Sequence, residues 1–101
     1  MDPLSISVAE LRSATTRLLN DVEQRFGPEL TFSDDCYWHV PFTEATQLNR
    51  RPRPDVGSVV DDVASVRECL ARDPTDVSSI WHHADHLVGV LREIARLDMA
   101  R

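Results

Sequence analysis

The segment Trp81-His82-His83-Ala84-Asp85-His86 carries the side chains of this 101-residue chain that are best suited to bind a metal. His82 and His86 are four residues apart, so they share one face of a helix, and Glu93 projects in nearly the same direction farther along. Two imidazoles and a carboxylate can bind zinc or nickel. The residue order differs from HExxH, however, and arginines occupy the same face. We therefore expect an exposed polar face, with a metal site at His82, His86 and Glu93 as the alternative.

The segment Asp34-Asp35-Cys36-Tyr37-Trp38-His39 combines carboxylates, a thiol, an imidazole and two aromatic rings. A Cys–His nucleophile pair needs contact between the two side chains. Residues three apart in an extended strand point to opposite faces, so we expect no such pair and no catalytic residue here. The aromatic rings either belong to the core of a small domain or bind a partner, in which case the contact residues are Asp34, Asp35, Tyr37 and Trp38.

The basic residues are all arginines, and three of them gather in the segment Arg50-Arg51-Pro52-Arg53-Pro54. Guanidinium groups on a stiff loop could bind a phosphate, a carboxylate or an acidic partner. An exposed connector is the more common role of such a charged run. We expect a connector in which Arg50, Arg51 and Arg53 make secondary contacts with a protein partner. The three glycines form no phosphate-binding loop, so we expect no nucleotide or other cofactor.

The adjacent carboxylates of Asp61 and Asp62 diverge by about 100° on a helix, so they do not form one acid–base or cation site. Asp61 falls in a first helical turn, where the helix dipole favours an acid. Asp62 lies at the border of an apolar stripe. We expect its carboxylate to pair with a residue from another element, such as one of the arginines of residues 50–53.

The net charge of −6, from 17 acids and 11 arginines, argues against a general nucleic-acid binder, which needs a basic face to displace counterions from phosphates. No apolar run approaches the roughly 20 residues that cross a membrane. The first residues have neither the basic nor the apolar region of a signal peptide. The two cysteines form no disulfide framework. We expect a cytoplasmic protein that binds neither nucleic acid nor membrane.

Helical periodicity and capping signals predict three helices, at residues 8–26, 59–72 and 79–97. Ser7 and Glu10 form a capping-box pattern before the first, and Ser58 is the N-cap of the second. The third has the widest apolar face, so we expect it at the centre. Short β-prone runs predict a β-hairpin or extended segment at residues 30–42. The predicted fold is one mainly α domain of residues 1–101, a three-helix bundle with this hairpin; the alternative is a small α+β fold.

The order of several short motifs resembles that of small uncharacterised bacterial proteins. These proteins share a Tyr-Trp strand, a Pro-containing connector, and a Gly-Ser step into a helix that opens with two aspartates. The corresponding residues here are Tyr37-Trp38, Pro52 and Pro54, Gly57-Ser58, and Asp61-Asp62. The resemblance covers residues 34–70 and implies no catalytic residue. Proteins of this size and character are often immunity, antitoxin-like or accessory proteins.

These observations favour a non-enzymatic domain that binds another protein through an acidic and aromatic surface, and an immunity or antitoxin-like role is its most specific form. Acidic surfaces speed the capture of basic partners electrostatically. The alternative function is a small metal-binding protein or metal-dependent enzyme that uses the histidines of residues 82–86. A homodimer is a further hypothesis, formed through apolar residues left over on the predicted helices, such as Val60, Val90 and Leu97.

Overall fold

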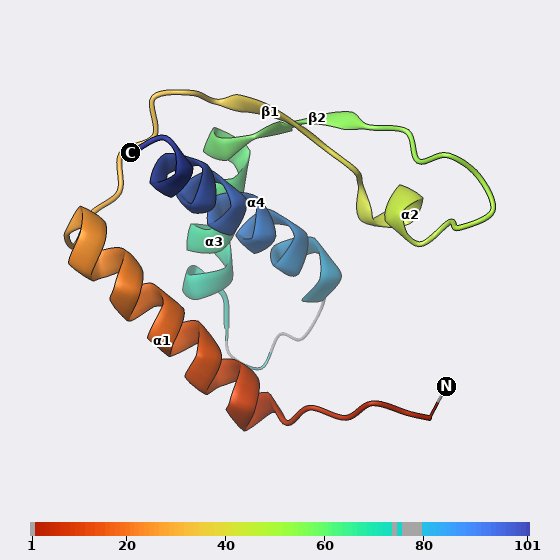
Figure 1. Ribbon diagram of the computed structural model, residues 1–101, viewed down its shortest axis with the longest axis horizontal. Coiled ribbons are helices and arrows are strands. Elements are labelled where there is room, and N and C mark those ends of the chain that lie inside the picture. The colour runs from red at the N-terminus through yellow and green to blue at the C-terminus, as the bar shows by residue number, and fades with distance from the viewer. Residues whose placement is uncertain (1, 74, 76–79) are drawn as a thin grey trace. The chain divides into compact units, whose positions relative to one another are not determined.

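The structure is a computed structural model that describes residues 2–73, 75 and 80–101. These residues form helices α1 (Val8–Phe26), α2 (Phe42–Ala45), α3 (Val59–Ala71) and α4 (Ile80–Met99), and strands β1 (Cys36–His39) and β2 (Asp55–Ser58) (Figure 1). They divide into two compact units, residues 1–31 and residues 32–101. None of the helices in the described part of the chain is long and apolar enough to cross a membrane.

Helix α1 has the bounds that the sequence predicts, because both of its ends carry strong local signals. The Ser7 hydroxyl accepts a hydrogen bond from the Glu10 amide (3.0 Å), and the Glu10 carboxylate accepts one from the Ser7 amide (3.1 Å). This capping box satisfies two amides that the first helical turn would otherwise leave unpaired. Gly27 ends the helix with a φ of 86°, which residues with a side chain rarely adopt.

Helices α3 and α4 pack against each other in the second unit. Ser58 caps α3 as predicted, since its hydroxyl accepts from the Asp61 amide (3.2 Å). Helix α3 ends at Ala71, one residue before the predicted end, and α4 runs to Met99, two residues beyond it. The predicted start of this last helix, residue 79, lies outside the described residues.

The two strands pair in antiparallel fashion, with Tyr37 opposite Gly57 and Trp38 opposite Val56. The predicted extended segment at residues 30–42 therefore contains strand β1, but the partner of this strand is residues 55–58, which lie outside the predicted range. The hairpin predicted within residues 30–42 is wrong in this respect. Gly57 explains the choice of partner, because a Cβ there would collide with the ring of Tyr37.

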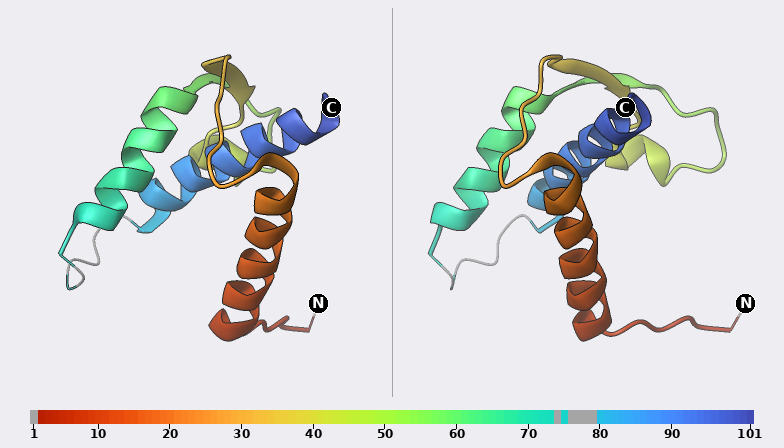
Figure 2. Two further views of the ribbon diagram at one scale, coloured as in Figure 1. Left: turned by 90° about the vertical axis from the view of Figure 1, so that its left-hand side faces the viewer. Right: turned by 60° about the vertical axis from the view of Figure 1, so that its left-hand side comes forward.

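A mainly α chain with a small antiparallel sheet is thus confirmed, whereas the three-helix bundle is not. Helix α3 packs with α4 in the second unit, and the sheet lies over one side of α4 (Figure 2). Helix α1 belongs to the first unit, and none of its residues, all of them described, is buried. The buried hydrophobic residues of the described chain are Val59 and Ile94, so the second unit has a small apolar core.

Candidate functional site

The carboxylate of Asp62 is the centre of a buried polar cluster in the second unit. Asp62 is only 3% exposed. Tyr37 donates from its hydroxyl to Asp62 Oδ2 at 2.5 Å, and Nδ1 of His86 lies 2.7 Å from Asp62 Oδ1. An ionised carboxylate only accepts hydrogen bonds, so Nδ1 carries the proton and Nε2 is the outer ring nitrogen. One side chain of α3 thereby connects β1 with α4.

Gly89 of α4 makes this cluster possible. A Cβ at this position would overlap the Asp62 carboxylate and the Tyr37 hydroxyl, so only a glycine lets the two groups meet against the helix. Gly89 lies within a long helical pattern, where a glycine is normally unfavourable. An isolated glycine inside a helical pattern was the one signal of this close approach.

The electrostatic environment favours the neutral form of Tyr37. Burial of the hydroxyl raises its pKa, and the hydrogen bond to Asp62 and the negative charges of Asp62, Asp85 and Glu93 raise it further. The phenol therefore remains a hydrogen-bond donor, not a base, at neutral pH. Every buried side-chain nitrogen or oxygen among the described residues has a hydrogen-bond partner, which is typical of a structural network.

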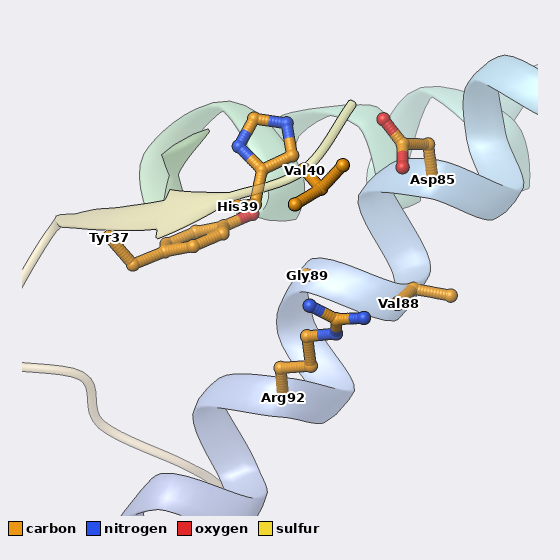
Figure 3. A pocket seen from close by; sticks show the side chains of 7 residues that line it. All are labelled: Tyr37, His39, Val40, Asp85, Val88, Gly89 and Arg92. Atoms are coloured by element: carbon orange, nitrogen blue, oxygen red, sulfur yellow. The ribbon is translucent and has the colours of Figure 1, made fainter. Parts of the chain in front are cut away.

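A small hollow lies beside the cluster, between β1 and α4 (Figure 3). Tyr37 and His39 line it from the strand, and Asp85, Gly89 and Arg92 line it from the helix. Its volume is about 30 Å³, which suits a water molecule. Pockets that bind small molecules are usually about 300–1,000 Å³. The titratable groups here are therefore not arranged around a space that could hold a substrate.

The structure brings together two of the three predicted metal ligands. The rings of His82 and His86 lie edge to face with centroids 4.7 Å apart. Glu93 is instead 5% exposed. Its carboxylate accepts a hydrogen bond from Nε of Arg96 at 3.0 Å and forms an ion pair with a terminal nitrogen of the same guanidinium at 3.0 Å. Among the described residues, no group of three His, Cys, Asp or Glu side chains could hold a metal ion.

The two aspartates predicted to contact a partner have different roles. Asp35 accepts hydrogen bonds at Oδ1 from the Ser58 hydroxyl and the Val60 amide, both at 2.9 Å, so it fixes the junction of β2 and α3. These bonds, led by that of the Val60 amide, lower the pKa of the Asp35 carboxyl. Asp34 remains largely exposed and pairs with Arg96 at 3.3 Å.

Tyr37 and Trp38, the two predicted aromatic contacts, point to opposite faces of β1. Tyr37 faces the buried cluster, whereas Trp38 is 75% exposed. Val56, directly opposite Trp38 on β2, is 53% exposed. Residues opposite each other in an antiparallel pair project to the same side. On the outer face of the sheet, which we define as Cys36, Trp38, Val56 and Ser58, the side chains of Trp38 and Val56 therefore form an exposed apolar patch.

The predicted arginine contacts belong to a loop that Glu44 organises. Both carboxylate oxygens of Glu44 accept from the guanidinium of Arg50, at 3.0 and 2.6 Å, and one also accepts from the Arg53 amide at 3.0 Å. Arg51 is exposed. The predicted pairing of Asp62 with another element is correct, but its partners are Tyr37 and His86 and not an arginine. Sequence reasoning gave Glu44 no role.

Phe42 and Trp81 form a second aromatic group away from the sheet. Their rings stack with centroids 6.5 Å apart and planes inclined by 24°, which joins α2 to the start of α4. Trp81 is nevertheless 60% exposed. The chain thus has two exposed tryptophans in different settings, because Trp38 stands on the open sheet face and Trp81 packs against another ring.

In comparisons with protein-family models, curated proteins and solved structures, nothing matches this chain.

Proposed function

We propose that the protein is a non-enzymatic domain that binds another protein through the outer face of its sheet, with Trp38 as the main contact. The observation that supports this most directly is the 75% exposure of Trp38 beside the half-exposed Val56. Tryptophan is among the residues most enriched in binding hot spots, where a partner buries its large apolar surface. A tryptophan held rigidly on a paired strand loses little conformational entropy on binding.

The residues on the inner face of the sheet have structural roles, which supports the outer face as the binding surface. Tyr37 occupies the inner face and is hydrogen-bonded to Asp62, so it holds the strand in place instead of contacting the partner. Asp35 similarly fixes the end of the sheet against α3. The binding surface is therefore the outer face, preorganised by residues that the sequence alone had assigned to the contact itself.

Charge favours a basic partner. The chain has a net charge of −6, and the exposed residues next to the outer face include Asp34, Asp35 and Asp55. An acidic rim around an apolar centre attracts a basic protein and accelerates its association. An immunity or antitoxin-like protein that captures a basic enzyme such as a nuclease is the most specific form of this proposal.

The two exposed tryptophans provide a matched test. The test compares three tagged proteins, namely the wild type, Trp38→Ala and Trp81→Ala. Each is used for affinity purification from the native host, and quantitative mass spectrometry identifies the bound partner. The affinity of this partner for each protein is then measured by calorimetric titration. We expect Trp38→Ala to weaken binding by about 2 kcal/mol or more, which is roughly 30-fold. Trp81→Ala should bind within about threefold of wild type. Equal binding by all three proteins would contradict the proposed surface.

Ionic strength tests the chemistry of the partner separately. If opposite charges steer the encounter, the association rate constant should fall steeply as salt increases, while the dissociation rate changes little. Asp55→Asn should reduce the association rate without removing the apolar contact. An association rate that is equal at low and high salt would contradict the proposal that the partner is basic. It would not affect the conclusion drawn from Trp38→Ala about the binding surface.

A further inference from the structure

Helix α1 carries an apolar stripe that follows a heptad pattern. Its apolar or β-branched residues recur at alternating intervals of three and four. With Val8 as position a of an abcdefg heptad, the a and d positions are Val8, Leu11, Thr15, Leu18 and Val22. Most of the stripe is exposed, with Leu11 and Leu18 about half exposed, whereas Val22 is partly buried. Apolar residues that repeat at a and d are the pattern of a coiled-coil seam, and Leu19 at an e position lies beside it.

We propose that α1 pairs in parallel with α1 of a second copy of this chain. All a positions of the seam are β-branched, namely Val8, Thr15 and Val22, and both d positions are leucine. This distribution favours two parallel strands over trimers or tetramers, because of the way β-branched and γ-branched side chains fit the a and d layers of a dimer. The partner that matches the stripe best is therefore an identical helix in the same register.

The polar residue in the seam does not oppose pairing. The Thr15 hydroxyl donates to the carbonyl of Leu11 at 2.8 Å within the same helix. Burial of Thr15 between two helices would therefore leave no unsatisfied hydroxyl, and its methyl group would contribute to the apolar layer. Thr15 can thus occupy an a position as a valine would.

The flanking charges also permit self-association. In a parallel pair, each g position faces the next e position of the other helix. These pairs are Ser7 with Arg12, Ala14 with Leu19, and Asp21 with Phe26. None of them places like charges together, and Ala14 with Leu19 widens the apolar contact. The d position after Val22 is Arg25, so the apolar seam ends there.

The size of the seam predicts a weak dimer. Burying a whole Val or Leu side chain removes about 60–120 Å² from water. With side chains that are about half exposed, five seam positions on two helices bury roughly 300–600 Å², against about 1,200 Å² or more in a stable specific interface. We therefore expect a reversible equilibrium between monomer and dimer at concentrations between about 10 μM and about 1 mM.

Sedimentation equilibrium with a matched pair of variants tests the pairing. The weight-average mass of the wild type should rise from 11.4 kDa toward twice that value with concentration. Leu18→Lys places a charge in the seam, whereas Asn20→Lys places the same charge about 200° away. We expect the first to remain monomeric and the second to dimerise like wild type, with equal helix content by circular dichroism. A monomeric wild type at all concentrations, or a Leu18→Lys variant that still dimerises, overturns the proposal.

Disulfide cross-linking tests the orientation. In a background with Cys36→Ser and Cys69→Ser, Val8→Cys should form a disulfide-linked dimer on mild oxidation, because identical residues face each other in a parallel pair. In an antiparallel pair, the two Val8 positions lie near opposite ends of the seam, about 20 Å apart and beyond disulfide reach. Dimerisation without cross-linking would overturn the parallel assignment. Trp38→Ala should dimerise normally, so this result is independent of the proposed function.

Discussion

The hydroxyl of Tyr37 and the carboxylate of Asp62, 25 residues apart in sequence, lie 2.5 Å apart and share a hydrogen bond. The same carboxylate meets His86, so β1, α3 and α4 converge on one buried anion. The second unit buries few large apolar side chains, and its buried polar residues include Asp62, Ser65 and Glu93. Its structure therefore depends on this polar cluster to an unusual degree, because loss of one partner leaves a desolvated group unpaired.

Removal of the Tyr37 hydroxyl tests that dependence. Tyr37→Phe keeps the ring and deletes one donor to Asp62, so we expect the free energy of unfolding to fall by about 1.5–3 kcal/mol, the range for hydrogen bonds to charged groups. Urea denaturation at neutral pH provides the measurement. Trp38→Phe, a similar aromatic change on the outer face of the same strand, should alter stability by less than about 0.5 kcal/mol. Equal stabilities of the two variants would contradict a structural role for the hydroxyl.

The substitution Gly89→Ala has two opposite effects on stability: alanine has the higher helix propensity, but its side chain has no space at this position. An alanine in the middle of a helix is normally about 1 kcal/mol more stabilising than glycine. Here its Cβ would fall on the Asp62 carboxylate and the Tyr37 hydroxyl, so we expect net destabilisation of about 1–3 kcal/mol. In a double-mutant cycle with Tyr37→Phe, the effects should be less than additive, because one of the colliding atoms is already absent. A stabilised Gly89→Ala variant would exclude the close approach.

The raised pKa of Tyr37 predicts a loss of stability in alkaline solution. Below the pKa of an unfolded tyrosine, about 10, both states hold the proton and the full contribution is present. Above it the unfolded chain releases the proton first, so stability falls as pH rises. The chain has one tyrosine and no lysine, and phenolate absorbance therefore reports this residue alone. In a Cys36→Ser, Cys69→Ser background, the folded protein should titrate above pH 10, and Tyr37→Phe should remove this part of the alkaline loss.

Local signals in the sequence predicted the helices well, because capping depends on residues that are close together in the chain. The capping box of α1 needed only Ser7 with Glu10, and the N-cap of α3 needed only the Ser58 hydroxyl and the Asp61 amide. The partner of β1 could not be predicted in the same way. Strand pairing depends on contacts between residues 16 or more positions apart, and the decisive feature is the space beside Gly57 for the ring of Tyr37.

The candidate site could also be predicted only in part. Helical periodicity placed Asp62 at the edge of an apolar stripe, which indicated a partner in another element, but the identity of that partner follows from strand register. Tyr37 and Trp38 have similar propensities, so the sequence could not decide which one faces inward. A shift of the register by one residue would exchange them. The predicted metal site did not take into account the ion pair between Glu93 and Arg96, which lies one turn away on the same helix.

The neighbouring aspartates 34 and 35 allow a final test with nearly identical sequence changes. Asp35 accepts from the Val60 amide and the Ser58 hydroxyl, whereas Asp34 makes an exposed ion pair with Arg96, and such pairs contribute about 0–1 kcal/mol. We expect Asp35→Ala to destabilise the protein more than Asp34→Ala at neutral pH. The lowered pKa of Asp35 means that its contribution is present above the unfolded value of about 3.9 and is lost as pH falls. In urea denaturation, the deficit of Asp35→Ala should therefore shrink between about pH 4 and pH 2. A deficit that is constant with pH, or equal for the two variants, would contradict the role of the Asp35 carboxylate at the start of α3.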